Sequence, residues 1–416
     1  MVKEKVTIGS SGGFDSFLPP VTELITWLGG PSKVHTLVFS ALQELGLGGP
    51  SRNTIEAAFN GGVTARSADR IKDGLDKIIG HYGLDGVDSR SVENLIGFGI
   101  NGADWLAFAR GVVAGLNRYQ RFRSIEINRV HAFLENRANA EETFIGSVQK
   151  RKSHKRSGKG EPDLLRAAIT QLFSEHTLIE AGDSRVYSDA IVSLYSDNDN
   201  ANLEEFAITL KASFNLRVDF YHQLLANLIA DMAAVRDSLD LPEGLIEMLD
   251  RDGAMSEMMP EWREGKLLTP TTKLYKLWSR VFASGDVPVS YREMAKHVPR
   301  PLPVRSNRPA TSVDSEDVET RRRRLHEWRT GTVPTTDQLT LFLESLTKNR
   351  GGAFLPFLMT RISTVWTKWI QEELEKVDKL TEQVPGLSNC LKFEDYILCF
   401  SRYPLYWKRV KGQATV

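Results

Sequence analysis

Four consecutive arginines, Arg321 to Arg324, give one short stretch of the chain a concentrated positive charge. The guanidinium group is a planar fork of donors that suits a phosphate or the edge of a guanine. Four successive helical residues span a full turn, so they cannot share one face. We expect one arginine stem to lie inward with Leu325 and Trp328, and two or three guanidiniums to point outward. The alternative is a solvated helix face, neutralised by the neighbouring acids Glu316, Asp317 and Glu319.

The arginine run stands within a series of four predicted helices. Pro270 suits a first helical turn, and Ser290 with Glu293 has the spacing of a capping box. Thr335 or Thr336 is expected to cap the last helix. The apolar residues of that helix are Leu339, Phe342, Leu343 and Leu346. The predicted helices cover residues 269–283, 290–298, 318–331 and 335–346.

In this order, residues 269–347 resemble a phage-repressor-like helix-turn-helix domain. The strongest part of the resemblance is the run Leu325, Trp328, Gly331, Val333-Pro334 and Leu339. The resemblance implies that the third helix is the DNA-recognition helix, with base-reading residues at its start and phosphate contacts at its flanks. Arg321, Arg322, Arg323, Arg324 and Arg329 are the candidate contacts.

The segment 299–317 departs from that family, which joins its second and third helices by a tight turn. This Pro-, Ser- and Arg-rich stretch is either a tolerated insertion or a basic loop that itself reaches a phosphate. The candidate contacts within it are Arg305 and Arg308.

A weaker echo of the same pattern lies at about residues 20–80. Ile55 and Gly61 are six positions apart, as are Leu325 and Gly331, and a valine follows two positions after each glycine. This region predicts either a second helix-turn-helix unit or an ordinary helical hairpin. The candidate contacts are Arg52, Asn53, Thr54 and Arg66.

The glycine-rich stretch Ser11 to Ser16, Ser-Gly-Gly-Phe-Asp-Ser, resembles the pyrophosphate-binding loop of the PP-loop ATP pyrophosphatases. Such a loop needs a buried strand before it and a helix directly after it. Here the only strand candidate is Val6–Ile8, and Pro19 and Pro20 would interrupt the required helix. An ATP-using enzyme is therefore a remote alternative, and no catalytic residue is assigned.

Helical periodicity dominates the chain, which predicts an all-α, multi-domain protein. The best strand candidates, Val6–Ile8 and Arg185–Tyr187, are very short. Composition shifts divide the chain into an N-terminal helical domain, a basic linker, a central helical domain, the helix-turn-helix-like domain and a C-terminal helical segment. Their ranges are 1–149, 150–162, 163–268, 269–347 and 348–416.

The basic linker could lie on a phosphate backbone or serve as a solvated spacer. Its candidate contacts are Lys150, Arg151, Lys152, Lys155 and Arg156. The tail "SRYPLYWKRVKG", residues 401–412, mixes aromatic and basic residues, and we expect its aromatic side chains to pack on a core or a partner.

Composition narrows the class of protein. The formal net charge is zero, so any nucleic-acid site must be a local basic patch. The two cysteines, Cys390 and Cys399, and the scattered histidines give no zinc or disulfide pattern. No metal or cofactor is expected. No secretory signal is visible and the window Leu95–Leu116 is too polar to span a membrane, which favours a cytoplasmic protein.

These observations favour a non-enzymatic DNA-binding protein, with RNA as a possible ligand, built from helix-turn-helix units on a helical scaffold. The large scaffold suggests protein partners or self-association inside a larger assembly of a bacterial, phage, mobile-element or antiviral defence system. The alternative is a helical adaptor or structural subunit that binds proteins, with "FLPFLMTRISTVWTKW" at 354–369 as its docking patch.

Overall fold

A computed structural model shows an all-α protein, as the sequence predicts. It describes residues 18–27, 34–60, 62–81, 105, 128–154, 162–195, 202–234, 241, 243–252, 254–283, 287–299, 313–347 and 354–412. Within these ranges the one sheet is a two-stranded antiparallel hairpin, β1 (Glu261–Arg263) and β2 (Lys266–Leu268). The α-helices are α1 (Val21–Trp27), α2 (Val34–Glu44), α3 (Arg52–Asn60), α4 (Ala65–His81), α7 (Asn128–His154), α8 (Pro162–His176), α9 (Ala181–Tyr195), α10 (Leu203–Ala234), α11 (Glu243–Asp252), α12 (Pro270–Val281), α13 (Tyr291–Lys296), α14 (Val313–Arg329), α15 (Thr336–Thr347), α16 (Phe354–Gln383), α17 (Phe393–Leu398) and α18 (Tyr403–Gly412).

Of the two predicted strands, one is a helix in the structure and the other falls on residues that the structure does not describe. Arg185–Tyr187 lies inside α9, because Tyr187 and Ile191 are one helical turn apart and both enter a core with Phe173. Val6–Ile8 lies outside the described residues.

Several predicted helix starts are confirmed by their caps. Thr269 accepts a hydrogen bond from the Thr272 amide and Pro270 occupies the first turn of α12. The Ser290 hydroxyl accepts from the Glu293 amide at 3.2 Å, which confirms the N-cap, whereas the Glu293 carboxylate pairs with Lys296 rather than completing the predicted capping box. At α15 the cap is Thr335, whose hydroxyl accepts from the Gln338 amide while Gln338 Oε1 accepts from the Thr335 amide. Local hydrogen bonds thus define where these helices begin.

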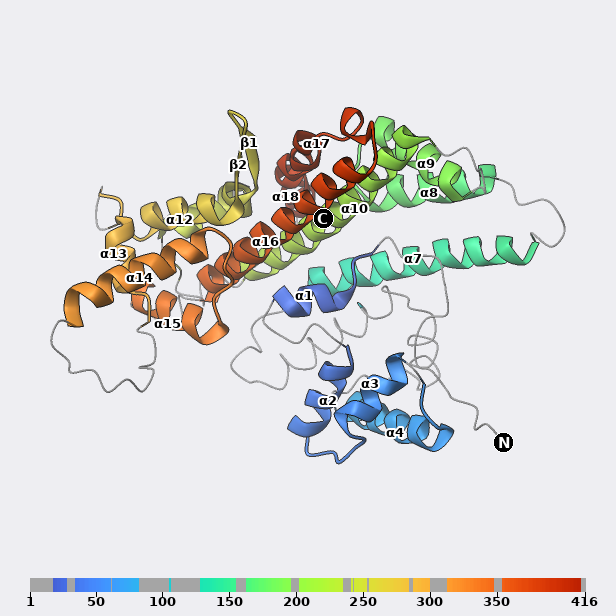
Figure 1. Ribbon diagram of the computed structural model, residues 1–416, viewed down its shortest axis with the longest axis horizontal. Helices are drawn as coiled ribbons and strands as arrows, with labels where there is room; N and C mark the ends of the chain where they lie inside the picture. The colour runs from blue at the N-terminus through green and yellow to red at the C-terminus, as the bar shows by residue number, and fades with distance from the viewer. Residues whose placement is uncertain are drawn as a thin grey trace. The chain divides into compact units, whose positions relative to one another are not determined.

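The chain forms two compact units, Met1–Asp231 and Met232–Val416, which divide within α10. In the first unit α8 and α9 lie side by side (Figure 1), and their apolar residues share a core with α10. The N-terminus of α7 is held by α10, because the Asp231 carboxylate accepts hydrogen bonds from the amides of Arg129 and Val130. The buried core residues of this part include Ile169, Phe173, Ile191, Ala212 and Leu216.

Two segments on either side of α2–α4 meet at one place. Trp105 Nε1 donates a hydrogen bond of 2.7 Å to the carbonyl of Pro19, and its ring lies tilted against that of Phe220 of α10, with centroids 4.8 Å apart. Glu23 of α1 is held by Arg217 and by the Tyr221 hydroxyl. Burial and the Glu23 carboxylate raise the pKa of Tyr221 well above its usual range. Pro19 with α1 and Trp105, which lie on either side of α2–α4 in the sequence, therefore meet beside α10.

Between these two segments of the sequence, α2, α3 and α4 enclose a separate small core. Leu42 from α2, Ile55 and Ala58 from α3, Val63 from the connection and Ile71 from α4 are its buried members. Their side chains contact one another, so three short helices form a self-contained bundle (Figure 1).

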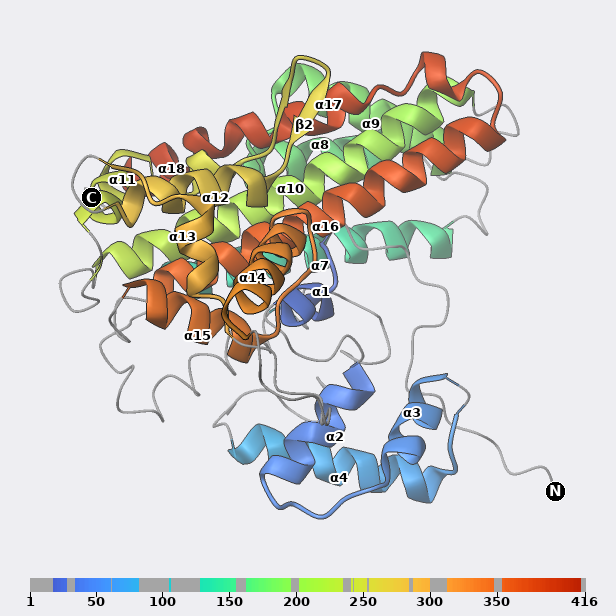
Figure 2. The same ribbon diagram turned by 60° about the vertical axis from the view of Figure 1, so that its left-hand side comes forward.

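In the second unit α12 packs along α16, as Figures 1 and 2 both show. Trp278 Nε1 donates to Thr360 Oγ1 at 3.0 Å inside this contact. The residues of 354–369 that were predicted to form an exposed docking patch lie mostly inside the unit, so that prediction is wrong. The buried ones include Leu355, Leu358, Met359, Ile362, Trp366 and Trp369.

The C-terminal aromatic residues pack on a core, as expected. Tyr403, Tyr406 and Trp407 of α18 are buried, whereas Lys408 and Arg409 are exposed. None of the described helices is both long enough and apolar enough to cross a membrane. The described residues also contain no cluster of histidine, cysteine or carboxylate side chains that could hold a metal ion.

Candidate nucleic-acid interface

α13 is fastened to α14 by two members of the arginine run. Arg321 Nη1 donates a 2.7 Å hydrogen bond to the carbonyl of Lys296, the last residue of α13. Arg324 Nη1 donates at 3.2 Å to the carbonyl of Pro299. Carbonyls at a helix C-terminus lack partners within the helix, so the Arg321 guanidinium satisfies an acceptor that would otherwise need water. Pro299 lies three residues beyond α13, so Arg324 holds the segment that follows this helix. Both arginines are therefore engaged in joining the two helices.

Arg321 also forms a largely buried ion pair. Its Nη2 lies 2.9 Å from Asp317 Oδ2, one helical turn earlier, and the two side chains are only 14% and 16% exposed. A second hydrogen bond joins Arg321 Nε to Asp317 Oδ1. This fork-to-fork contact fixes the guanidinium in the orientation that reaches Lys296.

The inward face of α14 is apolar, as predicted. Leu325 and Trp328 are buried, and the Trp328 ring meets Phe342 of α15 edge-on with centroids 5.7 Å apart. At the end of the helix the Arg329 guanidinium lies 4.9 Å from the centre of the Tyr291 ring, a cation–π contact with the first residue of α13. These contacts set which way the rest of α14 faces.

Arg322 and Arg323 point outward, with 62% and 74% of their side chains exposed. Each lies near one carboxylate of its own helix, Glu319 at 3.6 Å and Glu327 at 3.9 Å respectively. Exposed pairs at these distances contribute about 0–1 kcal/mol, so a phosphate could replace either carboxylate. Two outward guanidiniums agree with the two or three that the sequence predicts.

The connection between α14 and α15 is rigidly held. Gly331 has φ of 114°, and the Thr332 amide closes the helix end on the Glu327 carbonyl at 2.9 Å. The buried Arg361 of α16 donates to the Pro334 carbonyl at 2.5 Å, and burial lowers the pKa of this guanidinium. The glycine turn expected from the sequence is therefore present.

The connection between α13 and α14 differs from the expectation. α14 begins at Val313, inside the segment 299–317 that was predicted to be an insertion. Acidic residues suit the positive end of a helix, which accounts for the earlier start at "VDSEDVE". Arg305 and Arg308 lie outside the described residues.

In the N-terminal bundle, Arg52, Asn53 and Thr54 form the first turn of α3. The Thr54 amide donates to the Ser51 hydroxyl, and Arg52 Nη2 lies 3.5 Å from the Thr36 hydroxyl of α2. Arg52 and Asn53 are exposed, and Thr54 is half-buried. Arg66 is exposed in the first turn of the next helix, α4.

The predicted basic linker is partly helical. Lys150, Arg151 and Lys152 belong to the last turns of α7, which continues to His154. Lys155 and Arg156 lie outside the described residues, as does the glycine-rich stretch Ser11–Ser16. The described part of the chain contains no parallel sheet on which a phosphate loop of that kind could be built.

One exposed arginine of this region had not been singled out from the sequence. Arg292, in the first turn of α13, is exposed next to Tyr291, whose ring contacts Arg329. The sequence signal for Arg292 is its place two residues after the helix cap Ser290, in the first turn of a helix.

The chain was compared with protein families, curated proteins and solved structures. No family model, no curated protein and no solved structure matches the chain.

Proposed function

We propose that this chain is a non-enzymatic DNA-binding protein that contacts duplex DNA through the outer face of α14. The observation that carries the proposal is the division of the arginine run. Arg321 and Arg324 hold α13 against α14, while Arg322 and Arg323 project from the opposite side with weak partners. Because Arg321 and Arg324 hold α14 in place, Arg322 and Arg323 project from a helix with a defined orientation. The resemblance of residues 269–347 to repressor-like helix-turn-helix domains supports the same ligand.

The proposed setting is a cytoplasmic component of a larger assembly, in a bacterial, phage, mobile-element or defence system. The helical scaffold is far larger than two short DNA-contacting units require, which favours protein partners or self-association. The competing function is a helical adaptor that binds proteins. Its suggested docking patch is not exposed, because the apolar residues of 354–369 are mostly buried in the second unit.

Fluorescence anisotropy of a labelled duplex with the full chain tests the proposal. Wild-type protein should bind at low salt, and the affinity should fall steeply as salt is raised because arginines release counterions from DNA. The Arg322→Ala, Arg323→Ala double variant should bind much more weakly at the same salt. Absence of duplex binding by the wild-type protein at low salt would overturn the proposal.

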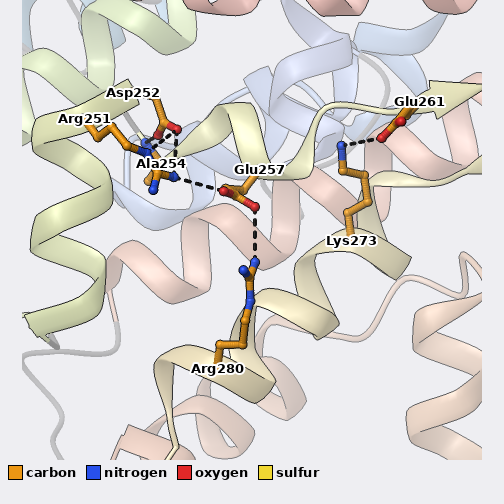
Figure 3. Close-up of polar contacts among 7 residues, drawn as sticks. All are labelled: Arg251, Asp252, Ala254, Glu257, Glu261, Lys273 and Arg280. Atoms are coloured by element: carbon orange, nitrogen blue, oxygen red, sulfur yellow. Dashed lines mark hydrogen bonds and ion pairs between the residues drawn. The ribbon is translucent and has the colours of Figure 1, made fainter. Parts of the chain in front are cut away.

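A matched control is Arg280→Ala. Arg280 is an exposed arginine of the same unit, paired with Glu257 at 3.2 Å, and Glu257 also binds Arg251 (Figure 3). Its charge is thus balanced within a local network rather than presented on α14. This variant should leave DNA affinity unchanged. An equal loss of affinity in Arg280→Ala would show that total charge, rather than the α14 face, governs binding.

A further inference from the structure

The start of α14 is acidic, which is unusual for a helix that reads base edges. Its first seven residues are Val-Asp-Ser-Glu-Asp-Val-Glu, and the first arginine comes only at position 321. Of the acidic residues, Asp317 is paired with Arg321, and Glu319 is exposed. A helix start that carries carboxylates repels both the phosphates and the acceptor-rich edge of guanine.

The exposed guanidiniums lie instead in the middle of the helix. Arg322 and Arg323 are the tenth and eleventh residues of α14, counted from Val313. With about 100° of rotation per residue, Arg322, His326 and Arg323 fall within one exposed arc of roughly 100°.

The exposed guanidiniums suit phosphates better than bases. A guanidinium fork binds a phosphate by paired, charge-assisted hydrogen bonds whatever the adjoining base. The donors and acceptors that read bases are generally asparagine, glutamine or arginine at a helix start directed into the groove. Here Arg321, the arginine nearest the start, is directed to the Lys296 carbonyl instead.

We propose that α14 binds the sugar–phosphate backbone of duplex DNA through Arg322 and Arg323 and does not read base sequence. This inference rests on the proposed function, and it replaces the base-reading role that the helix-turn-helix resemblance implies. α14 lies against the backbone by its middle, with its acidic start directed away from the phosphates.

The test compares duplexes of equal length and base composition but scrambled order, by anisotropy with the full-length chain over a range of salt. All sequences should bind with affinities within about threefold, far below the 10³-fold or greater preference of base-reading proteins. The Arg322→Gln, Arg323→Gln double variant should lower the slope of log affinity against log salt by about 1.8, since each lost phosphate contact contributes about 0.9. The change should be the same on every sequence.

Two further variants make the result specific. Arg280→Gln should leave the slope of log affinity against log salt unchanged. Glu319→Gln should raise affinity equally on all sequences, because it removes a repelling charge near Arg322.

Each alternative result has a distinct meaning. A preference above tenfold for one duplex, or a salt slope that Arg322→Gln, Arg323→Gln leaves unchanged, would overturn the backbone-binding inference while leaving DNA binding intact. Stronger binding to single-stranded RNA than to any duplex would also overturn it. Absence of binding to every duplex would overturn the proposed function itself.

Discussion

Arg321 closes the C-terminus of α13 by donating a hydrogen bond to the carbonyl of Lys296, a residue 25 positions earlier in the chain. The same guanidinium pairs with Asp317 in a setting that is mostly shielded from water. One side chain therefore fixes the relative position of two helices, and its neighbour Arg322 is left exposed.

Arg321→Ala should destabilise the second unit, whereas Arg322→Ala should not. Removing Arg321 deletes its charge-assisted hydrogen bonds to the Asp317 carboxylate and to the Lys296 carbonyl, so we expect a loss of about 1.5–3 kcal/mol. Arg322→Ala, on an exposed face, should change stability by no more than about 0.5 kcal/mol. Urea denaturation followed by circular dichroism measures both. Equal stability of the two variants would contradict the anchoring role of Arg321.

Gly331→Ala should lower stability and Gly244→Ala should raise it. Gly331 has φ of 114°, and an added Cβ would lie 2.9 Å from Gln371 Oε1, so the strain should cost about 1–3 kcal/mol. Gly244 lies within α11, and its Cβ would meet nothing within 4 Å. Alanine there should add about 0.5–1 kcal/mol because glycine is a poor helix former. Thermal denaturation of the two variants should shift in opposite directions.

Thr335→Ala should weaken the start of α15. The variant loses the hydroxyl that accepts from the Gln338 amide, and we expect a cost of about 0.5–2 kcal/mol. Thr332→Ala is the control, since Thr332 is exposed nearby and its contact with Glu327 uses the backbone amide. Amide hydrogen exchange should show faster exchange in the first turn of α15 for Thr335→Ala alone. Unchanged exchange there would argue against the cap.

Alkaline conditions should destabilise the protein through its buried tyrosines. Burial raises the pKa of Tyr275 and of Tyr403, with Tyr291 and Asp252 adding to the respective shifts. A tyrosine in an unfolded chain loses its proton near pH 10. The stabilising effect of the neutral folded form is therefore complete below about pH 10 and is lost as pH rises above it.

Tyr275→Phe isolates one of these groups. Among the described residues none forms a hydrogen bond with the Tyr275 hydroxyl, so the variant should be at least as stable as wild type at pH 8. Above about pH 10 its stability relative to wild type should grow by up to about 1.4 kcal/mol per pH unit. Denaturant midpoints measured from pH 8 to 11 test both parts. A clear loss of stability at pH 8 would reveal a hydrogen bond that this hydroxyl makes.

The sequence was informative where the determining contacts are local. Thr269, Ser290 and Thr335 cap helices within three residues of themselves, and Leu325 and Trp328 follow helical spacing. These features allowed the all-α fold and most helix boundaries near the arginine run to be predicted.

The long-range contacts could not be predicted in the same way. That Arg321 and Arg324 face α13 depends on carbonyls 25 residues away, which no spacing within the helix specifies. The local strand preference of Arg185–Tyr187 was overridden by packing of Tyr187 against Phe173 from α8. The burial of 354–369 likewise depends on α12, which supplies Trp278 to the same interior.

The hydrogen bond between Trp105 and Pro19 has a consequence for how the chain can change. The bond joins residues on either side of the bundle α2–α4 in the sequence, so genetic exchange could replace the bundle with another of different size while the contact between Trp105 and Phe220 of α10 is kept. Insertions with neighbouring ends are the kind that host folds accept most readily. Recombination is therefore expected to alter this bundle more readily than the remainder of the first unit.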